Sequence, residues 1–211
     1  MSKLYVALIA DAVRSRALPP ERRARLQATL RRALPDLNRT YRHDLAAGFG
    51  ITQGDELQCL LFSTKRVWEI AHAIRFTFGE ADWVIGCGRG AVTTALAAGK
   101  LAAPEVDGPC FHEARAAVES AKRDRLLFAF GGFGDAGPAL DGFARYYSAL
   151  YWSWTERQRH AATSWRFPRP APPPRPKVVP SAISHLRRRM AWPLVEQGDK
   201  MFRALLEANA A

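Results

Sequence analysis

The chain has 211 residues, 48% of them hydrophobic and 24% charged, a balance that predicts a globular protein with a sizeable core and excludes disorder throughout. No apolar run approaches the roughly 18–20 residues that span a bilayer, and the N-terminus lacks the pattern of a secretory signal, so we expect a cytoplasmic protein with no membrane partner. The net charge of +11 favours a polyanionic partner, nucleic acid before membrane, although an arginine-rich proteome would give a similar charge.

Hydrophobic periodicity predicts alternating strands and helices over the first 135 residues. Short apolar runs indicate strands, and apolar residues spaced by three and four indicate amphipathic helices. In chain order the predicted elements are a strand at 3–10, a helix from Pro19 to about Tyr41 or Asp44, strands at 45–53 and 56–63, a helix at 67–78, a strand at 82–90, a helix from Cys110 to about Lys122 and a strand at 126–130. This order contains the βαββαβ pattern of a ferredoxin-like core, an antiparallel sheet with both helices on one face.

The predicted hairpin carries two adjacent carboxylates at its turn. Asp55 and Glu56 follow Gly54, which has no side chain and can take the positive φ that a tight turn can require. The expected fold brings the end of the first strand beside this turn, which would place Asp11 next to Asp55. The three acidic residues form the first candidate site, and a turn without any chemical role is the alternative.

Glycines occupy alternate positions in the strand at 82–90, at residues 86, 88 and 90. Because glycine weakens a strand, this alternation indicates that another group approaches the backbone closely. The sequence leaves two alternatives open, a ligand lying beside the strand or a closely packed helix or strand.

The C-terminal part is predicted to be helical on both sides of a proline-rich arm. Aromatic residues at helical spacing predict a long helix from Ala139 to about Ala162, which would pack on the core or form a dimer seam. Seven of the 14 prolines lie between positions 168 and 180, a composition typical of an extended arm. The predicted organisation is a core at 1–135, a helical segment at 136–165, the arm at 166–180 and a basic helical tail at 181–211.

Within the tail, residues 181–190 predict a short helix, and a final helix is expected from about Leu194 to Ala208. An inner apolar stripe on the short helix would leave four polar residues outward, namely Ser184, His185, Arg187 and Arg188. These side chains suit contacts to phosphates and base edges. Solvated arginines on a packing helix are the alternative.

Short motifs spread over residues 3 to about 130 resemble the SatD family of bacterial proteins. They are LIAD at 8–11 with Ser15, LNRTY at 37–41, FGITQGDELQ at 49–58, IGCGRG at 85–90, and DGPCF at 107–111 with Ala114 and Arg115. In SatD-like proteins the C-terminal region looks like a helix-turn-helix, and SAIS at 181–184 resembles the start of a recognition helix. Here that motif is degenerate, because the proline arm stands where its preceding helix belongs.

At greater distance the same residues are similar to class III nucleotide cyclases and diguanylate cyclase (GGDEF) domains. That resemblance implies that Asp11 and Asp55, with Glu56 as a third ligand, hold Mg²⁺ or Mn²⁺ over a nucleoside triphosphate. It also implies nucleotide contacts from a second set of residues, namely Arg14, Ser15, Gly54 and Arg115. Phe111 stands where the cyclases carry a polar transition-state donor, and Gln53 replaces the first glycine of the GGDEF signature.

We therefore expect a regulatory protein, a homodimer by both resemblances, that binds a nucleotide or metal through its core and DNA through its tail. A divalent-metal-dependent enzyme acting on a nucleoside triphosphate is the alternative.

Overall fold

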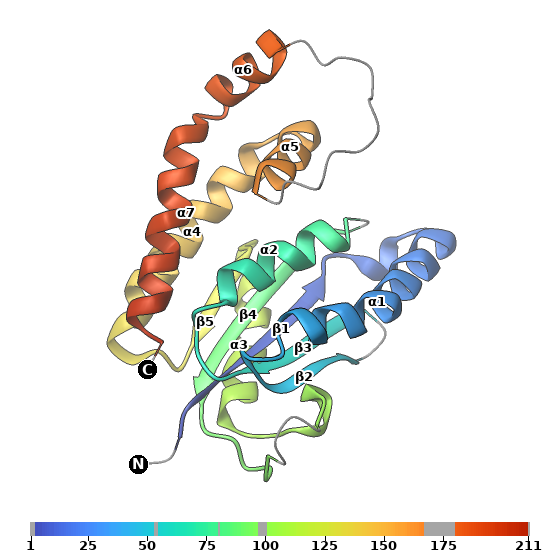
Figure 1. Ribbon diagram of the computed structural model, residues 1–211, viewed down its shortest axis with the longest axis vertical. Coiled ribbons are helices and arrows are strands. Elements are labelled where there is room, and N and C mark those ends of the chain that lie inside the picture. Colours follow the sequence, from blue (N-terminus) through green and yellow to red (C-terminus); the bar gives the residue numbers. More distant parts are fainter. Residues whose placement is uncertain (1–2, 53–54, 80, 97–100, 167–179, 211) are drawn as a thin grey trace.

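The structure, a computed structural model, describes residues 3–52, 55–79, 81–96, 101–166 and 180–210 (Figure 1). Gly54 and most of the predicted proline arm lie outside these residues. In the described part of the chain, no helix is both long and apolar enough to cross a membrane.

Five strands form one mixed sheet in the order β2-β3-β1-β4-β5. The strands are β1 (Tyr5–Ala12), β2 (Leu45–Thr52), β3 (Glu56–Leu61), β4 (Trp83–Gly90) and β5 (Phe128–Gly131). Strand β1 is antiparallel to both of its neighbours, β3 and β4, and β2 is antiparallel to β3, whereas β5 runs parallel to β4. The structure thus confirms the predicted α+β class, and it places β1 at the centre of the sheet.

Helices cover both faces of this sheet. Because successive side chains of a strand point to opposite faces, Leu8 and Ala10 pack with α1 (Pro20–Thr40) and α2 (Val67–Thr77), whereas Ala7 and Ile9 pack with α3 (Pro109–Asp124). Burial on both sides explains why the first strand reads as an uninterrupted apolar run.

The predicted long helix at 139–162 is divided into α4 (Gly137–Ser153) and α5 (Glu156–Arg166). The break lies at Trp154, whose backbone is extended (φ −79°, ψ 142°). Its side chain is buried in a cluster with Met190 and Trp192. The helical spacing of aromatic residues continues across this break, so hydrophobic periodicity alone could not show where the first helix ends.

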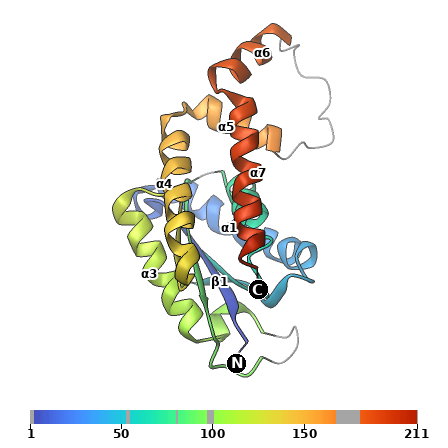
Figure 2. The same ribbon diagram turned by 90° about the vertical axis from the view of Figure 1, so that its left-hand side faces the viewer.

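The tail consists of α6 (Pro180–Arg189) and α7 (Trp192–Ala208). Figure 2 shows α7 running beside α4, and the rings of Phe202 and Phe143 stack at 4.8 Å between centroids. Phe202 and Leu206 are fully buried in the same core as the sheet. Helix α7 is therefore part of the main core, and it carries α6 at its N-terminal end.

Candidate functional site

Helix α3 lies unusually close to β4, and this closeness positions the site. A Cβ atom added to Gly88 would fall less than 3.0 Å from backbone atoms of Cys110 and Ala114, and Gly86 and Gly90 are similarly crowded by α3. Of the two alternatives that the sequence left open for these glycines, the structure shows the packed helix. The polar face of α3 is thereby held over the ends of β1 and β3.

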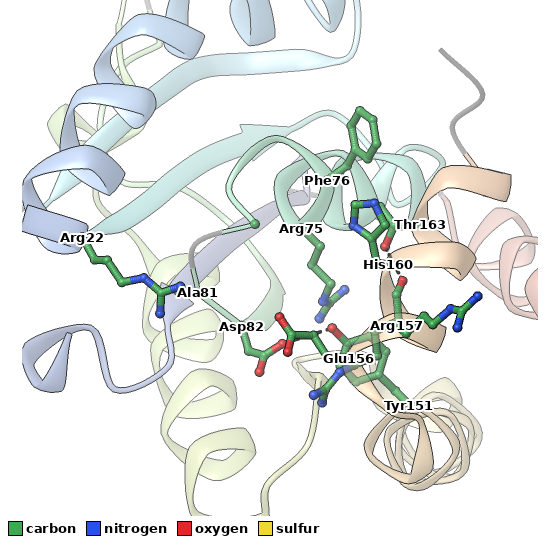
Figure 3. Close-up of a pocket in the computed structure, with 12 residues that line it drawn as sticks. Arg22, Arg75, Phe76, Ala81, Asp82, Tyr151, Glu156, Arg157, His160 and Thr163 are labelled. Carbon is green, nitrogen blue, oxygen red and sulfur yellow. Dashed lines mark hydrogen bonds between the residues drawn. The ribbon is translucent and has the colours of Figure 1, made fainter. Parts of the chain in front are cut away.

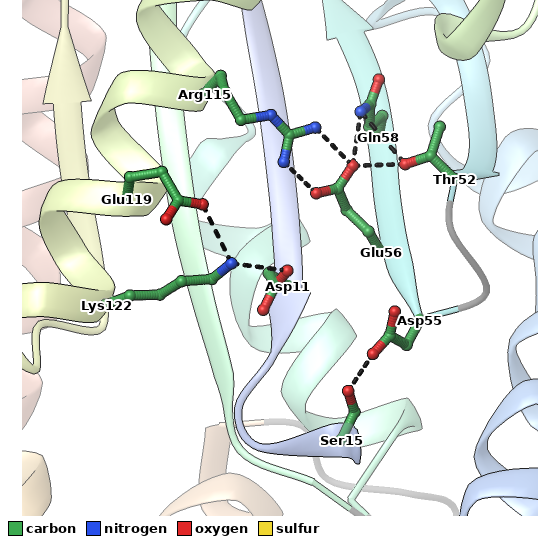
Figure 4. Close-up of polar contacts among 9 residues, drawn as sticks. All are labelled: Asp11, Ser15, Thr52, Asp55, Glu56, Gln58, Arg115, Glu119 and Lys122. Atoms are coloured by element: carbon green, nitrogen blue, oxygen red, sulfur yellow. Dashed lines mark hydrogen bonds and ion pairs between the residues drawn. The ribbon is translucent and has the colours of Figure 1, made fainter.

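Asp11 and Glu56 lie on that same face of the sheet. The two residues are direct cross-strand partners, and Asp11 follows Ile9 by two positions, so its side chain points toward α3 (Figure 4). The neighbour of Asp11 in the sheet register is therefore Glu56 rather than the predicted Asp55, because β3 begins at Glu56 and Asp55 still belongs to the turn.

Glu56 is buried and fully engaged. Arg115 binds it through both terminal nitrogens, with 2.7 Å from Nη2 to Oε1, and Thr52 and Gln58 donate further hydrogen bonds. Burial alone would raise the pKa of Glu56, but the hydrogen bonds, that from Arg115 foremost, outweigh burial and hold its pKa below the ordinary value. Glu56 is thus an ionised carboxylate that fixes the guanidinium of Arg115.

The other acidic residue on this face, Asp11, forms an ion pair with Lys122. The Nζ of Lys122 lies 3.0 Å from Oδ2 of Asp11 and 3.2 Å from Oε1 of Glu119. Burial raises the pKa of Asp11, and the ammonium of Lys122 opposes that rise. Arg115, Glu119 and Lys122 are spaced by four and three residues, so α3 presents all three on one face.

The side chain of Asp55, in the turn before Glu56, points to the segment that follows β1 and not to Arg115 (Figure 4), and Arg14 belongs to that segment. The hydroxyl of Ser15 donates a hydrogen bond to Asp55, which ties the turn before β3 to the segment after β1. Arg14 has a left-handed backbone (φ 52°), and its exposed side chain lines a cleft of about 500 Å³. We call this space the β1-end cleft; its charged and aromatic lining comprises Asp11, Arg14, Asp82, Lys122, Arg125 and Trp152.

The three predicted metal ligands face three different protein partners. Asp11 faces Lys122, Glu56 faces Arg115 and Asp55 faces Ser15. Over the described ranges, no group of three His, Cys, Asp or Glu residues lies close enough together to hold a metal ion. The carboxylates are thus near one another but do not form a preformed cation site, and Mg²⁺ or Mn²⁺ binding stays a prediction.

The predicted DNA-contacting residues lie far along the chain from this site, on α6. Ser184, His185, Arg187 and Arg188 are all exposed. Arg187 is partly committed within the protein, since its Nη2 lies 3.3 Å from Glu196 and its guanidinium lies over the ring of Trp165. Figure 1 places α6 at the end of the molecule remote from the C-terminus.

Comparison with known proteins identifies the family. Residues 5–125, more than half of the chain, match the family model described as the SatD family. The chain belongs to the SatD family. The matched region of this SatD-family chain contains β1 to β4, α1 to α3 and the charged residues of the β1-end cleft, whereas Trp152 lies outside it. Neither the curated proteins nor the solved structures contain a match.

Sequence reasoning missed Lys122, Glu119, Thr52 and Gln58 as members of the site. A signal for the first two was present, because Arg115, Glu119 and Lys122 have the spacing of one helix face. Gln58 follows Glu56 by two positions and so shares its face of the strand, whereas Thr52 is visible only once the hairpin register pairs it with Glu56.

Proposed function

We propose that this SatD-family protein binds a nucleotide in the β1-end cleft through a ferredoxin-like core and contacts DNA through α6. The strand order β2-β3-β1-β4, with α1 and α2 on one face, supports the ferredoxin-like assignment, to which β5 and α3 would be additions.

The lining of the β1-end cleft carries the nucleotide proposal. The described lining holds three cations, Arg14, Lys122 and Arg125, and two carboxylates, Asp11 and Asp82. Lys122 is already paired with Asp11 and Glu119, so the positive charge for phosphate groups comes chiefly from Arg14 and Arg125. A volume of about 500 Å³ lies within the usual size of small-ligand sites.

Trp152 gives the same cleft an aromatic wall for a base. Its indole nitrogen donates a hydrogen bond to the carbonyl oxygen of Arg125 at 2.8 Å, which fixes the orientation of the ring. Stacking of a base on a held aromatic ring is a favourable and sequence-tolerant contact. Phosphate-binding cations and an aromatic wall together are the combination that a nucleotide requires.

Binding without turnover is favoured over catalysis. Phe111, which stands where a cyclase carries a polar transition-state donor, is buried in the apolar core under α3. Arg115, the other candidate donor, is held by Glu56. Preorganised donors usually supply the largest catalytic contribution, and neither of these two positions offers one.

Calorimetric titration of the full chain tests the nucleotide proposal. Nucleoside triphosphates and cyclic dinucleotides are added with and without Mg²⁺ or Mn²⁺, and we expect one of them to bind. Replacing Lys122 or Arg14 by glutamine should then weaken binding about tenfold or more, because each change removes a charge-assisted phosphate contact. The matched control is Arg31→Gln, on the exposed face of α1.

A positive titration also tests the role of the metal. Nucleotide affinity that increases only when a divalent cation is present, and that decreases in Asp55→Asn, would favour the enzyme alternative. Absence of binding by every nucleotide, or equal affinity in the Lys122 and Arg14 variants, would rule out the β1-end cleft as a nucleotide site.

The exposed polar surface of α6 supports the second part of the proposal, contact with DNA. The last turn of this helix carries Arg187, Arg188 and Arg189, all exposed. Such side chains contribute sequence-independent affinity by neutralising phosphates and releasing counterions. A turn at Ala191, with a left-handed backbone, joins α6 to α7, which anchors it on the core.

Fluorescence anisotropy with a duplex DNA at several salt concentrations tests this contact. The plot of log affinity against log salt should have a slope reduced in magnitude by about 2 in the Arg187→Ala/Arg188→Ala double variant, because two phosphate contacts are removed. The double variant Arg31→Ala/Arg32→Ala on α1 removes the same charge elsewhere and should leave the slope nearly unchanged. No binding at low salt, or the same slope in both double variants, would refute a role for α6.

A further inference from the structure

A second cavity, of about 790 Å³, adjoins the start of β4 and contacts Asp82, as the β1-end cleft also does (Figure 3). Its described lining comes from the end of α2, from Gly79, Ala81 and Asp82 before β4, from the end of α4, from much of α5 and from the start of α1. Its charged lining consists of Arg22, Arg75, Arg157, Arg159, Asp82 and Glu156. Among the described residues, four arginines and two acidic residues thus line the cavity, an excess of two positive charges.

Arg75 is the unusual member of this lining. It is only 9% exposed, and one of its nitrogens, Nη2, donates to the carbonyl oxygens of Trp83 and Leu127, both at 3.0 Å. Its Nε and Nη1 atoms are buried and have no hydrogen-bond partner in the described part of the chain. Three of the five guanidinium N–H groups therefore lack an acceptor.

The described carboxylates nearby, Asp82 and Glu156, do not supply the missing acceptors for Arg75. Asp82 accepts a hydrogen bond from the hydroxyl of Tyr151 at 3.1 Å, and neither Asp82 nor Glu156 forms an ion pair with Arg75 among the described residues. Figure 3 shows the guanidinium of Arg75 directed into the space between α2 and α5. Buried charged donors without acceptors are costly, so a group that supplies oxygen atoms to this cavity would be strongly favoured.

We propose that this cavity, the Arg75 pocket, binds a small organic phosphate whose phosphoryl oxygens accept hydrogen bonds from Arg75. A phosphate monoester carries close to two negative charges at neutral pH, which matches the excess of the lining, and several acceptor oxygens. The cavity is too large for phosphate alone, and the ring of Tyr151 in its wall suits the organic part of the ligand. Arg22 and Arg157, on α1 and α5, add positive charge from two further elements.

This site is separate from the β1-end cleft. Among the described residues the two spaces share only Asp82, and the Arg75 pocket is lined by none of Asp11, Arg14, Lys122 or Arg125. Variants on either side can therefore tell which space a phosphate compound occupies.

The test uses the full chain and phenyl phosphate, with phenol and inorganic phosphate as comparison compounds. Calorimetry should show one phenyl phosphate bound per chain, weaker binding of inorganic phosphate and none of phenol. We expect Arg75→Gln to weaken phenyl phosphate binding at least tenfold, and Arg22→Gln and Arg157→Gln to weaken it severalfold each. Binding should be unchanged in Arg31→Gln, because Arg31 is exposed on α1 and lines neither space.

The Arg22→Gln and Arg157→Gln variants keep the test decisive if Arg75→Gln does not fold. No binding of phenyl phosphate at millimolar concentration, or equal binding in the Arg22 and Arg157 variants, overturns the proposal. Loss of binding in Lys122→Gln with retention in Arg157→Gln would place the phosphate in the β1-end cleft and likewise overturn it, while leaving the nucleotide proposal intact.

Discussion

Replacing Asp199 by alanine is expected to lower the free energy of unfolding by about 3–5 kcal/mol. Asp199 on α7 binds Arg166, the last residue of α5, through two hydrogen bonds of 2.7 Å and 3.0 Å. The side chains of this pair are only 5% and 9% exposed. Without Asp199 the guanidinium would stay buried with no counter-charge, and removal of one partner from a buried pair is far more costly than removal of the pair.

The surroundings of Arg166 reinforce this expectation. Its guanidinium lies within about 6 Å of four aromatic rings, those of Trp68, Tyr147, Trp154 and Trp192. The rings come from α2, α4, the break after α4 and α7, and they surround a charge carried by α5. The pair therefore attaches the tail helix to the core across residues 167–179, and we expect its loss to disturb the position of α6 as well.

Chemical denaturation of three variants measures the effect. The double variant Arg166→Met/Asp199→Leu removes both charges and should recover most of the stability lost in Asp199→Ala. Asp36→Ala breaks an exposed ion pair with Arg39 and should cost less than about 1 kcal/mol. If Asp199→Ala is no more destabilising than Asp36→Ala, the buried pair contributes little to stability.

Local pattern predicted the elements of this fold, and tertiary contacts decided its site. Strands and helices follow from spacings of two and of three to four residues, which nearby side chains determine, so nearly all were located from the sequence. Sheet register is different, because a shift of one residue changes which side chains meet. Local pattern therefore predicts that Asp11 lies near the hairpin turn, but not that its direct cross-strand partner is Glu56.

Ion pairs between distant segments were out of reach for the same reason. Lys122 and Asp11 lie more than a hundred positions apart, and Arg166 and Asp199 lie on opposite sides of the proline-rich stretch. Each pair depends on how helices pack against other elements, and charge pattern along the chain does not specify that packing. The glycines of β4 were predictable in part, since their spacing indicates that some group approaches the strand closely but does not identify that group as α3.

Those glycines lead to the second large effect, because Gly88→Ala is expected to cost about 3 kcal/mol of unfolding free energy. The added methyl group would meet backbone atoms of Cys110 and Ala114, which cannot rotate away as a side chain can. Helix α3 would have to move off the sheet as a whole. Because α3 carries Arg115 and Lys122, the same change should weaken nucleotide binding in the β1-end cleft.

Gly142→Ala is the matched control for this substitution. Gly142 lies inside α4, and a Cβ atom there would have no neighbour within 4 Å, so alanine should raise the free energy of unfolding by roughly 0.5–1 kcal/mol through its better helix propensity. If close packing of α3 is the reason for a glycine at position 88, thermal and chemical denaturation will show that Gly88→Ala lowers the free energy of unfolding and Gly142→Ala raises it. If Gly88→Ala kept full stability and lost only ligand affinity, the glycines of β4 would instead serve a bound molecule, and α3 would owe its position to other contacts.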